Sequence, residues 1–169
     1  MHIAIRSAET GYAADWDAGP RRCAVGRSGI GIKTREGDGV TPVGQWSLRR
    51  VLYRADRFEA APRTVLPVEK IEADDAWCDI SGDPNYNRLV RLPYATLNER
   101  LWRDDHVYDL IVVVGFNDAP VVQGKGSAIF VHLATPDYAA TAGCIALALP
   151  DLIEALAQLR RGDRLIVAG

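Results

Sequence analysis

The segment Leu110-Ile111-Val112-Val113-Val114 constrains the fold most, because five branched aliphatic residues follow one another without a polar residue. Such residues favour extended backbone, and a run that is apolar at every position fits a strand covered on both faces. Two further segments rich in apolar residues, Ala128 to Leu133 and Arg164 to Val167, predict more strands. Apolar residues between Trp46 and Tyr53 predict another, with an irregularity near Arg49-Arg50. The sequence therefore predicts a mostly β protein.

Two segments carry helix signals instead. Thr96 and Glu99 have the spacing of a capping box, which predicts a short helix over residues 96–102. Pro150 predicts the first turn of another helix, and Gly162 predicts its end. The apolar face of this second helix consists of Leu152, Ile153, Leu156 and Leu159. We expect a single domain over residues 1–169, mostly β with two or more helices, with a mixed or barrel-like sheet.

Composition excludes several classes of partner. The 169 residues include 20 basic and 22 acidic side chains, a net charge of −2, which gives no support for a nucleic-acid or anionic-membrane partner. No apolar run is long enough for a transmembrane helix. The first residues, Met1 to Arg6, alternate like a strand and predict no signal peptide.

Neither a metal nor a cofactor is expected. The three cysteines are an odd number and none has the Cys-x-x-Cys spacing of a zinc site. The stretch from Gly26 to Thr34 approximates a phosphate-binding loop, but Ile32 separates the second glycine from Lys33. In such a loop the lysine follows that glycine directly, because it must reach the phosphates. A hairpin turn explains these glycines better.

Cys144 is a candidate nucleophile, and His132 is the candidate base that would activate it. A thiol becomes strongly nucleophilic when a nearby imidazole takes its proton. Gly143 precedes the cysteine and allows a tight turn, whose amides can face a developing oxyanion. The alternative is a buried structural cysteine near a histidine with its own partner. A papain-like order is excluded because no histidine follows Cys144, and a tyrosine-phosphatase loop is excluded because position 150 is proline rather than arginine.

The chain resembles the catalytic domain of the L,D-transpeptidases, the YkuD-like family, which crosslinks bacterial peptidoglycan. Thr41-Pro42-Val43-Gly44 matches the family's Thr-Pro-x-Gly loop, and Thr141-Ala142-Gly143-Cys144 matches its nucleophile turn after the histidine. The stretches that are similar to one branch of the family are Tyr53-Arg54-Ala55-Asp56-Arg57, Trp77-Cys78-Asp79, Tyr86-Asn87 and Gly126-Ser127-Ala128-Ile129-Phe130. The resemblance covers nearly the whole chain and implies a YkuD-like mixed β-sandwich or barrel.

Two positions depart from the family. Most members have histidine where this chain has Ala142, and arginine where it has Ala146. The first change removes a second imidazole, and the second removes a cation near the substrate. The expected nucleophile and its base are unaffected by either change.

The resemblance implies a cysteine acyltransferase. Cys144 would attack a stem-peptide carbonyl, His132 would accept the thiol proton, and the amides of Ala142, Gly143 and Cys144 would hold the oxyanion. Either Asp137 or a backbone carbonyl, such as that of Leu133, would orient the imidazole. Further candidates for the substrate cleft are Thr141, Ala142, Arg54, Arg57, Tyr86 and Asn117.

Peptidoglycan stem peptides, as donor and acceptor, are the expected partners, and the family implies a location in the periplasm or cell envelope. Two alternatives remain. A hydrolase of the same fold would resolve the same thioester with water. A wall-binding module would bind peptidoglycan without forming a thioester. The sequence does not indicate an oligomeric state.

Overall fold

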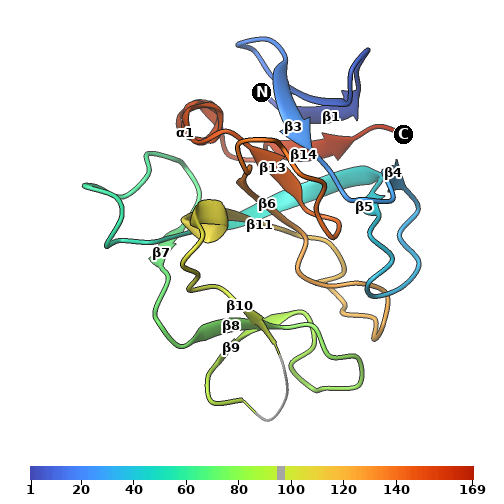
Figure 1. The fold of residues 1–169 in the computed structure, drawn as a ribbon, viewed down its shortest axis with the longest axis vertical. Coiled ribbons are helices and arrows are strands. Elements are labelled where there is room, and N and C mark those ends of the chain that lie inside the picture. Colours follow the sequence, from blue (N-terminus) through green and yellow to red (C-terminus); the bar gives the residue numbers. More distant parts are fainter. Residues whose placement is uncertain (95–97) are drawn as a thin grey trace.

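Strands dominate the computed structural model, which describes residues 1–94 and 98–169 (Figure 1). Nine strands form the main sheet: β1 (Ile3–Ser7), β2 (Tyr12–Asp15), β3 (Arg21–Ala24), β6 (Gly44–Tyr53), β7 (Val68–Lys70), β11 (Leu110–Val114), β12 (Phe130–Leu133), β13 (Ile145–Leu147) and β14 (Arg164–Val167). A second sheet contains β8 (Asp75–Cys78), β9 (Arg88–Arg91) and β10 (Glu99–Arg100). The short strands β4 (Ile30–Gly31) and β5 (Thr41–Pro42) pair with each other.

Strand β6 closes the main sheet into a barrel. Its first half pairs with β14 and its second half pairs with β11, so eight strands form a ring and β7 extends from β6. A register shift lies between Val113 and Val114, whose partners on β6 are Arg50 and Leu48. Arg49 is the extra residue, which confirms the predicted irregularity. The barrel-like, mostly β fold is therefore as expected.

The apolar run in β11 is buried on both faces, as predicted. Leu110, Val112 and Val114 point into the barrel core, whereas Ile111 and Val113 belong to a second apolar cluster outside it. The sheet of β8, β9 and β10 forms a layer apart from the barrel strands (Figure 1). It contributes Trp77 to the outer cluster. Because both faces of β11 are covered, a polar residue anywhere in this strand would be desolvated.

The prediction of two or more helices is wrong. The described residues contain one α-helix, α1 (Leu149–Gln158), and one 3₁₀ turn, η1 (His106–Tyr108). Helix α1 lies where it was predicted, with Pro150 in its first turn, and Leu152, Ala155 and Leu156 are buried against the barrel. No helix in the described part of the chain is long and apolar enough to cross a membrane.

The predicted helix at residues 96–102 is replaced by strand β10. Glu99 and Arg100 pair with Trp77 and Ala76 of β8, and the amide of Leu101 donates to the Asp75 carbonyl. Residues 95–97, and so part of the capping box, lie outside the described residues. Pairing with a distant strand has overridden a local helix signal.

Removing side-chain volume from β11 should destabilise the whole barrel. Ile111 is completely buried, so Ile111→Ala should lower the free energy of unfolding by about 2–5 kcal/mol through lost apolar burial and a residual cavity. Ile32 is 80% exposed and provides the control. Ile32→Ala should change the free energy by less than about 0.5 kcal/mol. Equal effects in urea unfolding would contradict burial of β11 on both faces.

Candidate active site

Parallel pairing of β12 with β13 places the two predicted catalytic residues on one face. His132 pairs with Ala146, and Cys144 immediately precedes β13. Alternate residues of a strand share a face, so Phe130 and His132 point outward from the barrel. The ring of Tyr108 contacts both Phe130 and His132, and Cys144 packs in the same outer cluster. The outer face of these strands is therefore the candidate active site.

The thiol of Cys144 is buried and bonded to backbone groups. Its S–H donates to the carbonyl of Ala128 over 3.1 Å, and Sγ accepts the amide of Phe130 over 3.4 Å. Only 7% of the residue is exposed, and burial raises the pKa of the thiol to about 12. The side chain of Cys144 is thus a neutral thiol with a defined orientation.

The imidazole of His132 is oriented by the backbone. Nδ1 lies 2.9 Å from the carbonyl oxygen of Leu133, which can only accept, so the neutral ring carries its proton on Nδ1 and leaves Nε2 as the base. Burial lowers the pKa of His132 to about 4. The orienting group is the Leu133 carbonyl, one of the two expected alternatives, whereas Asp137 bonds to Thr135 instead.

Cys144 and His132 do not bond to each other in this resting arrangement. Both hydrogen bonds recorded for Sγ within residues 1–94 and 98–169 join it to backbone groups. Catalytic hydrogen bonds are often absent in an enzyme without substrate and form only when substrate binds. Proton transfer from thiol to imidazole therefore requires Sγ to leave the Ala128 carbonyl.

The turn before Cys144 can accommodate only glycine at position 143. Gly143 has a φ of +139°, and a Cβ there would lie 2.9 Å from the Val40 carbonyl. Thr41, which is fully buried, donates its hydroxyl to the Gly143 carbonyl over 2.9 Å and accepts the Gly26 amide over 2.8 Å. The threonine of the Thr-Pro-x-Gly stretch thus supports the nucleophile turn.

The predicted oxyanion amides differ in availability. Gly143 donates its amide to the Thr141 hydroxyl over 3.1 Å, and that hydroxyl donates to the Cys144 carbonyl over 2.6 Å. Gly143 and Thr141 are therefore engaged in holding the turn. Among the described residues, the amides of Ala142 and Cys144 have no acceptor, so these two are the candidate oxyanion donors.

Tyr86 and Asn117 form hydrogen bonds within the chain. Tyr86 is 1% exposed and accepts the Gly126 amide, while its own hydroxyl donates to Glu36. The side-chain amide of Asn117 donates to the carbonyls of Val122 and Gly126. Both side chains shape the loop that ends at Ala128, the acceptor for the Cys144 thiol.

Asn87, which was not among the predicted site residues, holds that same loop. Its Oδ1 accepts the Ala128 amide and the Trp77 indole N–H, each over 3.0 Å. Its Nδ2 donates to the carbonyls of Phe116 and Asn117. Every polar atom of this buried side chain is therefore satisfied, which fixes the Ala128 carbonyl beside Sγ.

Arg54 and Arg57 make internal contacts. Arg54 forms a two-bond ion pair with Asp56 and donates to the Arg103 carbonyl over 2.8 Å. Arg57 pairs with Asp109 and donates to the Asp104 carbonyl over 3.2 Å. Both guanidinium groups therefore have partners within the chain. Through these contacts the two arginines hold the segment that leads into η1.

Lys33 is a further residue near the site that the sequence did not indicate. Its side chain is 2% exposed, and Nζ lies 2.6 Å from Asp38. Burial acts to raise the pKa of Asp38, but Lys33 and three backbone amides outweigh it and lower that pKa to about 2. Nζ is 3.7 Å from the position that a Cβ would occupy on Gly143. A fixed ion pair thus flanks the nucleophile turn.

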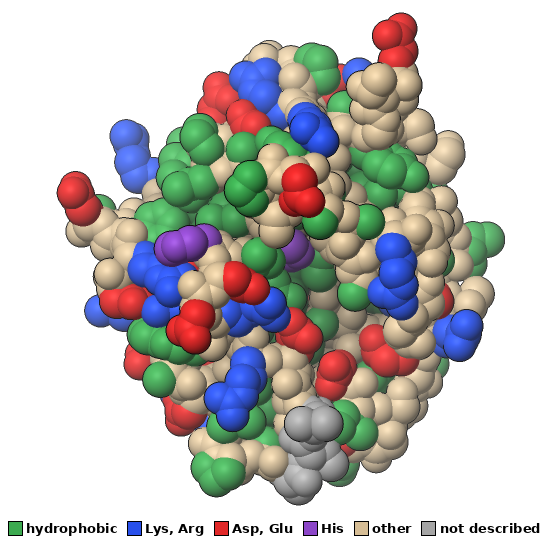
Figure 2. All heavy atoms as spheres, viewed as in Figure 1, with side chains coloured by type: hydrophobic (Ala, Val, Ile, Leu, Met, Phe, Trp, Pro, Cys, Tyr) green, Lys and Arg blue, Asp and Glu red, His purple; other side chains and the backbone are tan. Residues whose placement is uncertain are grey.

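A cavity of about 190 Å³ opens beside His132. Tyr108, Ala142 and Ala146 line it, together with Arg103 from the segment before η1. Arg103 and Tyr108 were also not predicted, because nothing in their local sequence indicates that η1 packs against β12. Figure 2 shows a hollow on this side of the molecule, with acidic, basic and apolar side chains intermixed around it.

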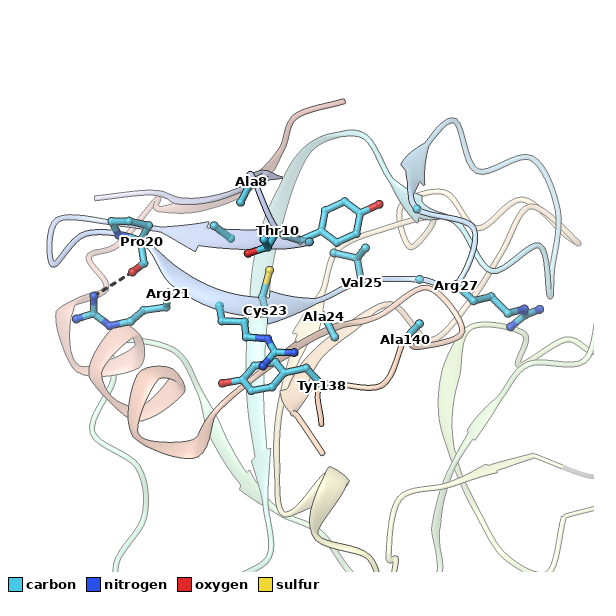
Figure 3. A pocket seen from close by; sticks show the side chains of 16 residues that line it. Ala8, Thr10, Pro20, Arg21, Cys23, Ala24, Val25, Arg27, Tyr138 and Ala140 are labelled. Carbon is cyan, nitrogen blue, oxygen red and sulfur yellow. Dashed lines mark hydrogen bonds between the residues drawn. The ribbon is translucent and has the colours of Figure 1, made fainter. Parts of the chain in front are cut away.

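A larger groove lies elsewhere. It has a volume of about 710 Å³ and runs along β2 and β3, and Figure 3 shows Cys23, Arg21 and Tyr138 beside it. Arg21 is paired with Asp151 and Glu154 of α1. No histidine lines this groove among the described residues, so its thiol has no base there.

The remaining cysteines differ from Cys144 in their surroundings. Cys23 and Cys78 are buried free thiols, and burial raises the pKa of each, that of Cys23 to about 12. Across residues 1–94 and 98–169, no three or more histidine, cysteine, aspartate or glutamate side chains are grouped to hold a metal ion. Of the three thiols, Cys144 shares its face with a histidine whose Nε2 is available.

The outer face of the β-barrel thus carries a thiol and an imidazole next to a glycine turn, an arrangement that could support cysteine-dependent acyl transfer. Comparison with protein families matches residues 3–167 to YkuD, the L,D-transpeptidase catalytic domain. The match covers nearly the whole chain, and the chain belongs to this family. Comparisons with curated proteins and with solved structures gave no match.

Burial of His132 should make folding stability depend on pH. Burial lowers the pKa of His132 to about 4 in the folded chain, against about 6.5 for a histidine in an unfolded chain, so below pH 6.5 the unfolded chain binds a proton that the folded chain does not. Stability should therefore fall as pH decreases from 6.5 to 4, by about 3 kcal/mol from this residue alone. The measurement is urea unfolding between pH 4 and 8.

His132→Gln should remove this part of the pH dependence, and the difference from the unmodified chain isolates it from titrating carboxylates. His2→Gln is the control and should retain the full slope, since His2 is exposed. An unchanged slope in His132→Gln would show that the ring is not buried in its neutral form.

Proposed function

We propose that this chain is a peptidoglycan L,D-transpeptidase that forms stem-peptide crosslinks through a thioester on Cys144. The observation that carries the proposal is the shared outer face of Cys144 and His132, with Nε2 of the imidazole available as a base. Membership of the L,D-transpeptidase family supports the same chemistry. The enzyme would act where peptidoglycan lies, in the periplasm or cell envelope.

Acylation begins with the carbonyl of the third stem residue placed against Sγ. Substrate binding frees the thiol from the Ala128 carbonyl, and its proton passes to Nε2 of His132 as sulfur attacks. The amides of Ala142 and Cys144 stabilise the oxyanion, and each such donor typically contributes roughly 3 kcal/mol. The carbon–nitrogen bond to the terminal D-amino acid then breaks, and His132 returns the proton to the departing amine.

Transfer uses the same groups in reverse order. An amine from a neighbouring stem attacks the thioester carbonyl, and His132 accepts the proton that this amine loses. The carbon–sulfur bond breaks, and Cys144 leaves as a thiol that regains its proton. The product is an amide that joins two stems, with no net change in the enzyme.

The neutral resting pair suits this mechanism. A thiol with a pKa near 12 and an imidazole with a pKa near 4 do not form a stable ion pair. The proton therefore moves only as the carbon–sulfur bond forms, when the oxyanion is also stabilised. A buried neutral thiol is protected from side reactions with solvent oxidants between turnovers.

Product analysis on purified tetrapeptide muropeptides tests the proposal. Mass spectrometry should detect crosslinked dimers and free D-amino acid. Trimmed monomers alone would identify the chain as a hydrolase of the same fold. Binding to sacculi without any product would identify a wall-binding module, and either result would contradict transfer.

Variants assign the residues in the same assay. Cys144→Ala should abolish product because the nucleophile is lost, whereas Cys23→Ala and Cys78→Ala should retain it. His132→Gln should lower the rate by about 10²–10⁴-fold, which is typical for loss of a general base. Full activity in Cys144→Ala would exclude the thioester route.

A further inference from the structure

We propose that Arg103 binds a free carboxylate of the stem peptide in the cavity beside His132. This inference rests on the proposed function and names the chemical group of the substrate that binds in the cavity. It assigns to Arg103 a contact with substrate, and to Arg54 and Arg57 the positioning of Arg103.

Arg103 provides the positive charge of the cavity. The other described lining residues are apolar or neutral, including His132, whose pKa of about 4 leaves it uncharged near pH 7. Ala142 and Ala146 have short side chains, so the space between the guanidinium and the imidazole is left for a ligand. A carboxylate that enters this space would meet Arg103 as its counter-charge.

The guanidinium of Arg103 has more N–H donors than its contacts with Asp105 and Glu99 use. Arg103 bonds to both oxygens of Asp105, over 2.9 and 2.5 Å, and approaches Glu99 at 3.5 Å. A guanidinium has five N–H donors, so at least two are left after these three contacts. Asp105 occupies one edge of the group, and Glu99 is held at long distance. A substrate carboxylate can therefore be bound by the remaining donors without breaking the Asp105 pair.

Arg103 is held in place before any ligand arrives. Its backbone carbonyl accepts from Arg54, whose guanidinium lies 3.6 Å above the ring of the adjacent Trp102. Arg57 holds the next carbonyl, that of Asp104. The Arg103 guanidinium also lies 5.1 Å from the ring of Tyr108. Less conformational entropy is then lost on binding, which strengthens the contact with the ligand.

Stem peptides carry carboxylates at the peptide terminus and on side chains, and either could be the group bound. Both sources share one chemistry, a free carboxylate near the scissile bond. Bidentate guanidinium–carboxylate bonds discriminate against a carboxamide, which lacks the charge and offers one oxygen instead of two. The discrimination between carboxylate and carboxamide is thus the property to measure.

The test measures calorimetric binding of tetrapeptide stems to Cys144→Ala, so that no turnover is needed. Three peptides are compared: one with all carboxylates free, one amidated at the terminus and one amidated on the side chain. One amidation should weaken binding by about 10–100-fold, the range expected for a hydrogen bond to a charged group. Unchanged binding of both amidated peptides would overturn the proposal without any further variant.

The measured quantity is the ratio of the dissociation constants of the amidated and the free-carboxylate peptide. When Arg103→Gln is added to Cys144→Ala, this ratio should fall close to one. Arg103→Lys should retain part of the preference. The matched control is Arg100→Gln, because Arg100 is exposed on β10 and should keep the full ratio. If Arg103→Gln weakens binding of carboxylate and carboxamide peptides equally, Arg103 has only a structural role and the proposal fails. A failure of the proposed function would give a different result. The chain would then bind muropeptides with a preference for the free carboxylate but would not crosslink them.

Discussion

Parallel pairing of β12 with β13 is the interaction on which the candidate site depends. It sets His132 opposite Ala146 and leaves Cys144 at the start of β13, so that thiol and imidazole share the outer face of the barrel. Parallel strands need a connection that crosses over, and the segment from residue 134 to 144 provides it and ends in the Gly143 turn. Thr41 ties that turn to the barrel through the Gly143 carbonyl. The shared face of the thiol and the imidazole follows from this arrangement.

Burial controls the reactivity of the pair. Burial removes both side chains from water, which raises the pKa of Cys144 and lowers the pKa of His132. Both groups are therefore uncharged at rest. The Ala128 carbonyl, itself positioned by Asn87, accepts the hydrogen bond of the thiol. A family-typical arginine is absent at position 146, and Arg103 brings a guanidinium to the same cavity from another part of the chain. A guanidinium thus reaches this cavity from a different segment of the fold.

Local patterns predicted the parts of the structure that local physics determines. The all-apolar run of β11 and the Pro150 start of α1 were readable because periodicity and capping act within a few residues. The helix expected at 96–102 was wrong because Glu99 pairs with β8, a contact that no local pattern encodes. The position of Arg103 beside His132 was missed for the same reason, because it arises from packing of η1 against β12, between segments far apart in sequence. Cys144 and His132 were predicted as site residues from their spacing and from the family motif, whereas the hydrogen bonds that orient them required coordinates.

Acylation by a carbapenem tests most directly whether Cys144 acts as a nucleophile on the outer face that it shares with His132. A strained lactam carbonyl needs only an activated thiol and an oxyanion site, so the experiment does not depend on recognition of the stem peptide. Intact-mass spectrometry should show one adduct per chain, located on the Cys144 peptide and absent from Cys144→Ala. An adduct on Cys23 or Cys78, or none at excess drug, would contradict the assignment of the active site.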